Sequence, residues 1–236
     1  MTVNFATIDK LIEEGFLMDS RFNSPAEIAS LVSKSGVTKS MLSLPKMILL
    51  GLMAGAFIAF GGAASDVAMH GVADVGLARV VAGVIFPVGL MLVVFTGSEL
   101  FTGNCLMIIP TLEKKIKVAS MLRNLVVVYI SNFVGAMIID LLITFSGQPN
   151  YSNGGLGAFT IKVALAKTTI NPATAIISGI LCNILVCLAI VMATGATDAI
   201  GKIFGVFFPI CAFVVCGFEH CVANMFYIPI GVMAAM

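Results

Sequence analysis

The sequence predicts an all-α membrane protein built as an inverted repeat of three-helix units, with the second and the fifth helix broken. Three observations lead to this prediction: an extreme composition, five long apolar runs, and one polar motif that occurs twice. Charged residues make up 11% of the 236 residues and apolar residues 59%, whereas about 25% of a soluble protein is charged. A mean hydropathy of +1.09 excludes a soluble globule, whose exterior must face water.

The charge balance and the cysteines exclude several other classes of protein. A formal net charge of +1 gives no field that would attract nucleic acid. The cysteines form no C-x-x-C motif, and a spacing of five residues places neighbours on different helix faces. We therefore expect no metal site, no disulfide framework and no cofactor, and interpret the six as small packing residues: Cys105, Cys182, Cys187, Cys211, Cys216 and Cys221.

Residues 1–45 predict a cytoplasmic unit of amphipathic helices. Acidic and basic residues alternate there without an apolar core, so the segment is not a signal peptide. The run Ser24-Pro25-Ala26-Glu27 indicates an N-cap, a proline at the first helical position and a capping box, and Gly36 is a candidate stop. An earlier helix is expected around Phe5, Ile8 and Ile12. These helices are expected on the membrane surface or at the protein's cytoplasmic mouth.

Residues 46–236 predict the transmembrane channel domain. About 20 apolar residues cross a bilayer, and five runs satisfy this length. Glu99 interrupts the second run, and Glu219 with His220 interrupts the fifth. The segment 147–171, which holds Lys162 and Lys167, is interpreted as a polar, glycine-rich loop. The five runs are Met47 to Ser65, Val80 to Leu112, about Asn124 to Phe145, a span within Thr168 to Thr197, and Ile203 to Met236.

Lysine and arginine gather on one side of these spans. The N-terminal segment and the loops at 110–123 and 194–202 hold most of them, whereas the opposite side has only Arg79, Lys162 and Lys167. The side rich in positive charge is normally cytoplasmic. We therefore expect a multi-pass protein of the cell (inner) membrane with its N-terminus in the cytoplasm.

The two interrupted spans carry the same motif, G-x-E-x-x-x-[GA]-N. Residues 97–104 read GSELFTGN, and residues 217–224, which lie 120 positions later, read GFEHCVAN. Three spans separate the copies, and an odd number reverses the chain direction, which predicts an inverted-topology repeat. The same offset places the partner of the third span near 244–265, beyond this chain. We expect a sixth span to be absent from the sequence rather than an incomplete repeat.

Four residues near the breaks are candidates for chemistry. Glu99 and Glu219 are expected to satisfy backbone N–H groups that the broken helices leave free. His220 is the only histidine at membrane depth, and Thr102 lies near the equivalent break; an ionisable group at that depth indicates function. Lys167 lies five residues before Pro172, at the mouth of the fourth span, where it would attract anions from outside.

The motifs at 97–104 and 217–224, together with Asn171-Pro172, resemble those of the formate/nitrite transporter family of pentameric anion channels. The resemblance implies an aquaporin-like fold, a homopentamer in membrane lipid, and one pore per subunit. It also implies a central pair, Thr102 and His220, with Lys167 as the outer lysine. Hydrogen-bonding partners would be Asn183 and Asn224. Apolar constrictions would be formed by Phe86, Leu90, Leu100, Phe101, Val186 and Phe213.

The function predicted from the residues and the resemblance together is a channel for small monovalent anions of weak acids. Formate, nitrite and hydrosulfide are the substrates that the resemblance implies. Because an ion in an apolar slit pays a large desolvation cost, either a proton from His220 or hydrogen bonds at the central site must offset it. The main alternative is an aquaporin-type channel for neutral solutes, and a redox or metal protein built on the cysteines is the second. No nucleophile–base pair or phosphate loop indicates an enzyme.

Overall fold

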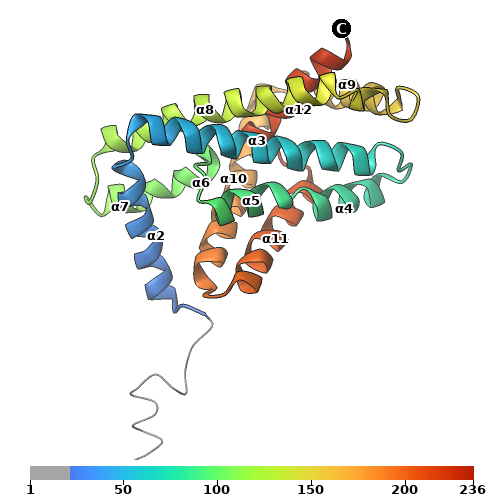
Figure 1. Cartoon of the computed structure of the whole chain (residues 1–236). Helices are drawn as coiled ribbons and strands as arrows, with labels where there is room; N and C mark the ends of the chain where they lie inside the picture. Colours follow the sequence, from blue (N-terminus) through green and yellow to red (C-terminus); the bar gives the residue numbers. More distant parts are fainter. Residues whose placement is uncertain (1–21) are drawn as a thin grey trace, which may run out of the picture.

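The computed structural model describes residues 22–236, so the helix expected around Phe5, Ile8 and Ile12 lies outside the described part of the chain. Within residues 22–236 the fold is helical and contains no strand (Figure 1). The helices are α2 (Pro25–Ser40), α3 (Leu44–Met69), α4 (Val75–Ile85), α5 (Val88–Thr96), α6 (Phe101–Asn104), α7 (Ile108–Leu112), α8 (Val118–Phe145), α9 (Gly155–Thr168), α10 (Pro172–Gly195), α11 (Ala199–Cys216) and α12 (Cys221–Ala234).

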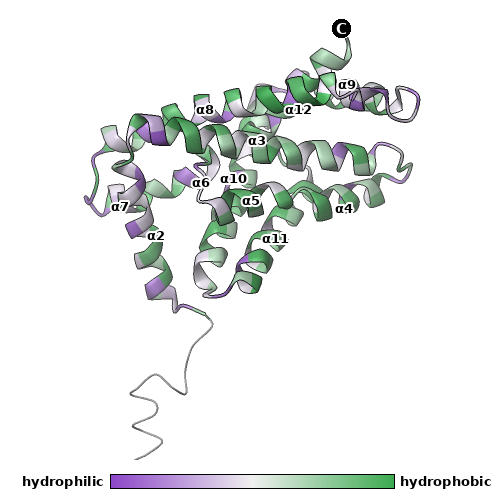
Figure 2. Cartoon of the chain, in the orientation of Figure 1, coloured by the Kyte–Doolittle hydropathy of each residue, from purple (hydrophilic) through white to green (hydrophobic). Residues whose placement is uncertain are grey.

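Five of these segments are long and apolar enough to cross a membrane: α3, α4 with α5, α8, α10 and α11. The second and the fifth are each followed, after a break, by a shorter apolar helix, at Phe101–Leu112 and Cys221–Ala234. Hydrophobic residues cover the long helices, and hydrophilic ones gather at their ends (Figure 2). The expected five spans, two of them broken, are confirmed.

Helices α3 and α8 lie side by side and approach so closely that two glycines touch backbone atoms (Figure 1). A Cβ added to Gly55 would lie 1.9 Å from the carbonyl oxygen of Asn132, and one added to Gly135 would lie 2.0 Å from that of Leu52. Any side chain at either position would push the helices apart. Small residues at helix contacts are typical of proteins in lipid, where van der Waals packing drives association.

Helix α2 begins as the sequence predicts and ends later. The backbone nitrogen of Ser24 donates to Glu27 Oε2 at 2.7 Å, and the capping box is complete. Gly36 does not stop the helix, which continues to Ser40. A Cβ at Gly36 would lie 2.7 Å from Cγ of Pro110, so this glycine permits close packing of α2 on α7 instead. The division of the chain at residue 45 stays a prediction.

The segment expected to be a loop at 147–171 contains a helix, α9, and that expectation was wrong. Leu156, Thr160 and Ala164 are buried at intervals of four residues, which forms one face of a helix. This face packs on α12, where a Cβ at Gly231 would lie 2.3 Å from that of Ala164. Glycines at the start of α9 disguised the helical pattern in the sequence.

Gly135→Val is expected to lower the stability of the protein in detergent by about 3 kcal/mol, the upper end of typical overpacking costs, because the clash is with backbone. Thermal unfolding of the purified protein measures this effect. Gly71→Val is the matched control, since a Cβ at Gly71 meets nothing within 4 Å. Equal unfolding temperatures for both variants would contradict the backbone contact of α3 with α8.

Candidate functional site

The two helix breaks have the same backbone geometry. Gly97 (φ 67°, ψ 28°) and Gly217 (φ 72°, ψ 29°) end their helices in the left-handed region, which glycine adopts without strain. Three residues later, Leu100 (φ −106°, ψ 126°) and His220 (φ −104°, ψ 114°) are extended and precede the next helix. Equivalent residues lie 120 positions apart, as the motif repeat predicts.

At the first break, the neighbouring helices α3 and α8 supply partners for the freed backbone groups. The nitrogen of Glu99 donates to the carbonyl oxygen of Leu50 at 3.1 Å. The nitrogen of Phe101 donates to Oδ1 of Asn132 at 2.9 Å. Nδ2 of Asn132 donates in turn to the carbonyl oxygens of Gly51 and Glu99, at 2.8 and 2.9 Å. One buried amide of α8 therefore bonds three backbone groups.

At the second break, side chains on α10 and in the break itself take this role. The nitrogen of Glu219 donates to Oγ of Ser178 at 2.9 Å. The nitrogen of Ala223 donates to Nδ1 of His220 at 2.9 Å, so the imidazole is the N-cap of α12. An N-cap acceptor satisfies one of the N–H groups that a helix start leaves unpaired.

Glu99 binds a lysine and an asparagine instead of the backbone N–H groups that the sequence suggested. Nζ of Lys39, at the end of α2, donates to Oε1 of Glu99 at 2.7 Å and to Oδ1 of Asn104 at 2.9 Å. Nδ2 of Asn104 donates to Oε2 of Glu99 at 2.7 Å. This Lys39 cluster (Lys39, Glu99, Asn104) ties α2 to the first break.

The same arrangement occurs at the second break. Nζ of Lys167, at the end of α9, donates to Oε2 and Oε1 of Glu219 at 2.9 and 3.2 Å. Nδ2 of Asn224 donates to Oε2 of Glu219 at 2.8 Å. The Lys167 cluster (Lys167, Glu219, Asn224) thus repeats the Lys39 cluster, and in each the carboxylate is held by a cation and an amide.

Lys39 is a site residue that the motif search missed, although the sequence contains a signal for it. Lys39 stands six residues before Pro45, and Lys167 stands five before Pro172. Both prolines lie in the first turn of a spanning helix. Lys39 and Lys167 lie 128 positions apart rather than 120, so comparison at the offset of the motif does not find Lys39.

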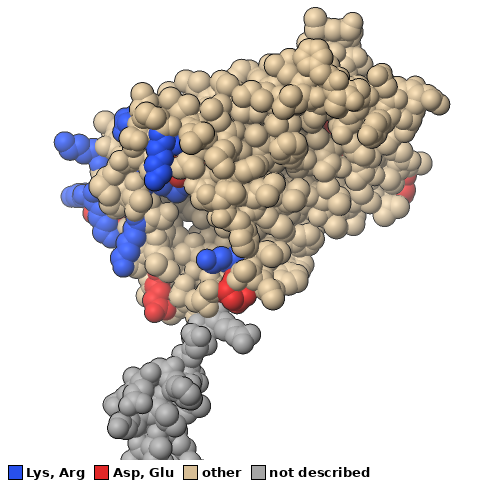
Figure 3. All heavy atoms as spheres, in the orientation of Figure 1, with Lys and Arg blue, Asp and Glu red and all other residues tan. Residues whose placement is uncertain are grey.

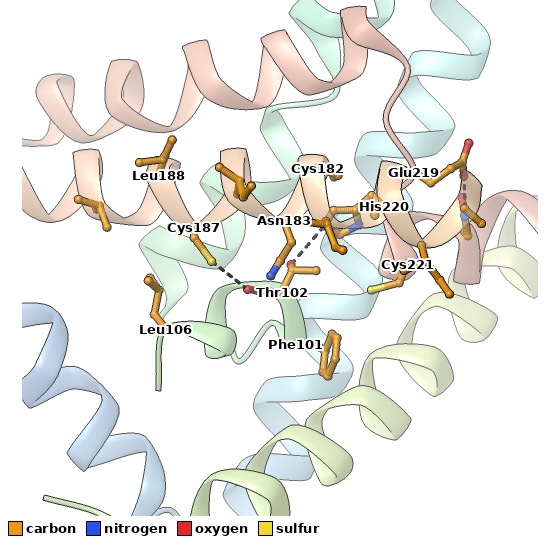
Figure 4. A pocket seen from close by; sticks show the side chains of 17 residues that line it. Phe101, Thr102, Leu106, Cys182, Asn183, Cys187, Leu188, Glu219, His220 and Cys221 are labelled. Carbon is orange, nitrogen blue, oxygen red and sulfur yellow. Dashed lines mark hydrogen bonds between the residues drawn. The ribbon is translucent and has the colours of Figure 1, made fainter. Parts of the chain in front are cut away.

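Thr102 and His220 meet at the centre of the protein, with Thr102 Oγ1 and His220 Nε2 3.2 Å apart (Figure 4). Both are buried, at 3% and 4% exposure. Because Nδ1 accepts the Ala223 N–H bond, it carries no hydrogen, and a neutral ring has its hydrogen on Nε2. Nε2 therefore donates to Thr102, and the ring stacks on Phe213 with centroids 5.6 Å apart.

Two cavities meet at this pair. An outer cavity of about 620 Å³ is lined by α4, α9, α11 and α12 and contains Arg79, Lys162 and Lys167. An open cleft of about 800 Å³ between α6, α10 and α12 contains Thr102 (Figure 4). Three residues line both cavities: Glu219, His220 and Asn224.

The expected amide partners lie around this pair. Asn183 on α10 lines the cleft and extends toward Thr102 (Figure 4). The Oδ1 atoms of Asn183 and Asn224 are buried without a hydrogen-bond partner among the described residues. Both amides therefore retain unused hydrogen-bonding capacity beside the central pair.

Of the six residues expected to form constrictions, three line one of the two cavities and three do not. Phe86 and Phe213 line the outer cavity and contact each other edge to face, with centroids 5.6 Å apart. Phe101 lines the cleft. The other three are buried in the hydrophobic core and line neither cavity: Leu90, Leu100 and Val186.

Comparison with known proteins decides the family. A family model described as Formate/nitrite transporter matches residues 26–236. The chain belongs to the formate/nitrite transporter family. It is similar to a probable formate transporter of Methanothermobacter thermautotrophicus (42% identity, covering 91% of this chain and 85% of the relative), and to a formate channel of Bacillus thuringiensis (40% identity, covering 88% and 80%).

Its fold also matches a solved structure described as a pentameric formate channel with formate bound. The TM-score is 0.73 and the identity 33%, over 80% of this chain and 75% of that one. The resemblance and the fold class expected from the motifs are thereby confirmed. The family consists of channels and transporters rather than enzymes, so this chain is a multi-pass membrane transport protein.

Asn132→Leu is expected to lower the free energy of unfolding by about 3 kcal/mol or more, because three buried backbone groups lose their partner at 1–3 kcal/mol each. Chemical or thermal unfolding in detergent measures the loss. The neighbouring Ser131→Ala is the control, since among residues 22–236 the Ser131 side chain bonds only within its own helix, to Val127. Equal stabilities of the two variants would show that Asn132 does not support the first break.

Proposed function

We propose that this protein is a channel for small monovalent anions of weak acids, with formate as its first substrate. The observation that carries the proposal is the Thr102–His220 pair, which lies between two cavities. The relatives named for formate, and the solved channel described with formate bound, support the choice of anion. Nitrite and hydrosulfide are further candidates, because they share its small size and single charge.

Hydrogen bonds at the central pair offset the cost of stripping water from the anion. The donors are the hydroxyl of Thr102 and the Nε2–H of His220, which exchanges its bond to Thr102 for one to the anion, and the N-terminal end of α12 adds a favourable dipole. Hydrogen bonds with one charged partner contribute about 1.5–3 kcal/mol each. Together these groups compensate a small anion where the surrounding wall is apolar.

His220 acts in this proposal as a neutral hydrogen-bond donor rather than as a proton donor. An imidazolium would carry hydrogen on Nδ1 and would lose the bond from the nitrogen of Ala223. It would also place a second positive charge next to the Lys167 cluster and a helix N-terminus. These costs favour the neutral ring, so hydrogen bonding is preferred over protonation of the anion.

The orientation and assembly are part of the proposal. Lysines and arginines gather at the end of the molecule formed by α2, α7 and the start of α8 (Figure 3). Such a bias supports a cytoplasmic location for this end and for the N-terminus, in a protein of the cell (inner) membrane. The outer cavity then opens to the outside. In a homopentamer embedded in lipid, each subunit would keep its own pathway.

Flux into proteoliposomes tests the proposal against the aquaporin-type alternative. Vesicles containing the protein are expected to take up formate faster than empty vesicles, whereas glycerol uptake stays at the empty-vesicle rate. Nitrite and hydrosulfide are measured in the same preparation to rank the anions. Fast glycerol flux without formate flux would overturn the proposal in favour of a neutral-solute channel.

His220→Asn is expected to lower formate flux about tenfold, because the Nε2 donor is lost, while the shape of the pH profile follows the parent. Asparagine is a good N-cap, so α12 should keep its start. Thr102→Ala, which removes the other donor, is expected to lower flux without changing the profile. A His220→Asn channel whose flux no longer depends on pH would overturn neutral hydrogen bonding and favour the protonation route.

Lys167→Ala is expected to reduce formate flux more at low than at high ionic strength. Its removal leaves Glu219 as an unpaired negative charge facing the outer cavity, and salt screens such repulsion over about 10 Å at 0.1 M. The double variant Lys167→Ala/Glu219→Gln removes both charges and should recover much of the low-salt flux. Losses that are the same at both salt concentrations would indicate a short-range structural role for Lys167.

A further inference from the structure

Arg79 lies against the second helix break. It belongs to α4 and lines the outer cavity, to which His220 and Lys167 also contribute. A Cβ added to Gly217 would lie 2.5 Å from Nη1 of Arg79 and 3.1 Å from its Cζ. A guanidinium group therefore lines the cavity beside this turn, and Gly217 leaves the space that it occupies.

Arg79 carries an uncompensated charge, whereas Lys167 does not. The ion pairs among residues 22–236 join Lys39 to Glu99, Lys115 to Glu113 and Lys167 to Glu219. Within this part of the chain Arg79 forms neither an ion pair nor a hydrogen bond, and its side chain is exposed to the cavity. All its N–H donors are thus available to a ligand.

The first break has no such group. A Cβ added to Gly97 would meet nothing within 4 Å, and the residue 120 positions after Arg79 is Ala199. The two breaks match in backbone geometry and in their lysine–glutamate–asparagine clusters, so the guanidinium departs from the repeat. Because Arg79 forms no hydrogen bond with the backbone of the break among the described residues, its departure from the repeat indicates a role toward solutes in the outer cavity.

A guanidinium differs from an ammonium in the anions that it prefers. Its parallel N–H groups match two oxygens of one planar anion, and this bidentate geometry adds specificity to charge. Formate and nitrite present two such oxygens, whereas hydrosulfide and chloride do not. The second cation of the cavity that lacks an ion pair among the described residues, Lys162, supplies only a point charge.

We propose that Arg79 forms an outer binding position for planar two-oxygen anions, from which they pass to Thr102 and His220. This inference rests on the proposed function and deepens it by naming the substrate class that the outer cavity selects. Arg79 sets the affinity and the selectivity for anions arriving from the outside, while the central pair sets the rate of passage.

The half-saturating formate concentration is measured with the protein in planar bilayers, with formate added on the side of the outer cavity. Arg79→Ala should raise it about fivefold at low ionic strength, the effect of one unit charge at contact distance in water. The maximal formate current should stay near that of the parent. Arg79→Lys keeps the charge, so it should retain most of the affinity but lose the preference for formate over hydrosulfide.

Lys162→Ala is the matched control, because it removes the same charge from the same cavity away from the break. Its half-saturating concentration should change less than twofold. Equal shifts for Arg79→Ala and Lys162→Ala, or an Arg79→Lys channel with unchanged selectivity, would overturn the assignment. If the parent protein conducts no formate at all, the proposed function itself fails. Unfolding temperatures in detergent identify a variant that fails to fold, and Arg79→Gln then replaces Arg79→Ala.

Discussion

Backbone that leaves the helical ladder at membrane depth must find its hydrogen bonds within the protein, because lipid offers none. The rest of this structure depends on that constraint, which applies at two places. It explains why α3 and α8 touch through glycines, since only a close approach lets Leu50 and Asn132 reach the first break. It also explains why a histidine cap, rather than a bulky apolar residue, begins α12. The polar centre of the protein is thus a by-product of the way in which its helices are interrupted.

The sequence was sufficient to predict the membrane class, the five spans and the two breaks, whereas the pair of Thr102 with His220 was implied by the family resemblance. Each of these leaves a local mark, such as an apolar run, a glycine, or a polar residue where polar residues are rare. Helix α9 left no such mark, because its glycines and threonines disguised a buried face that only packing on α12 reveals. The expectation that Glu99 and Glu219 bind backbone N–H groups was wrong for a similar reason, because their partners Lys39 and Lys167 come from other helices.

The charges at the two helix breaks are arranged so that the centre of the proposed pathway stays close to neutral. Each glutamate of the repeat is paired with a lysine, and the histidine between the cavities caps α12 in its uncharged form. A fixed positive charge at the centre would bind an anion strongly and release it slowly. In the proposed function, neutral donors with paired charges at either side would lower the barrier for the anion without creating such a trap.

Leu100 and His220 occupy the same backbone position in the two halves, yet only the histidine can cap a helix with its side chain. At the first break Asn132, from another helix, bonds the nitrogen of Phe101, the first residue of α6, and the side chain of Leu100 adds no hydrogen bond. At the second break the nitrogen bonded by His220 is that of Ala223, the third residue of α12. The two halves therefore support their helix starts through different residues and different N–H groups, so the substitutions that one half accepts are no guide to those that the other half accepts.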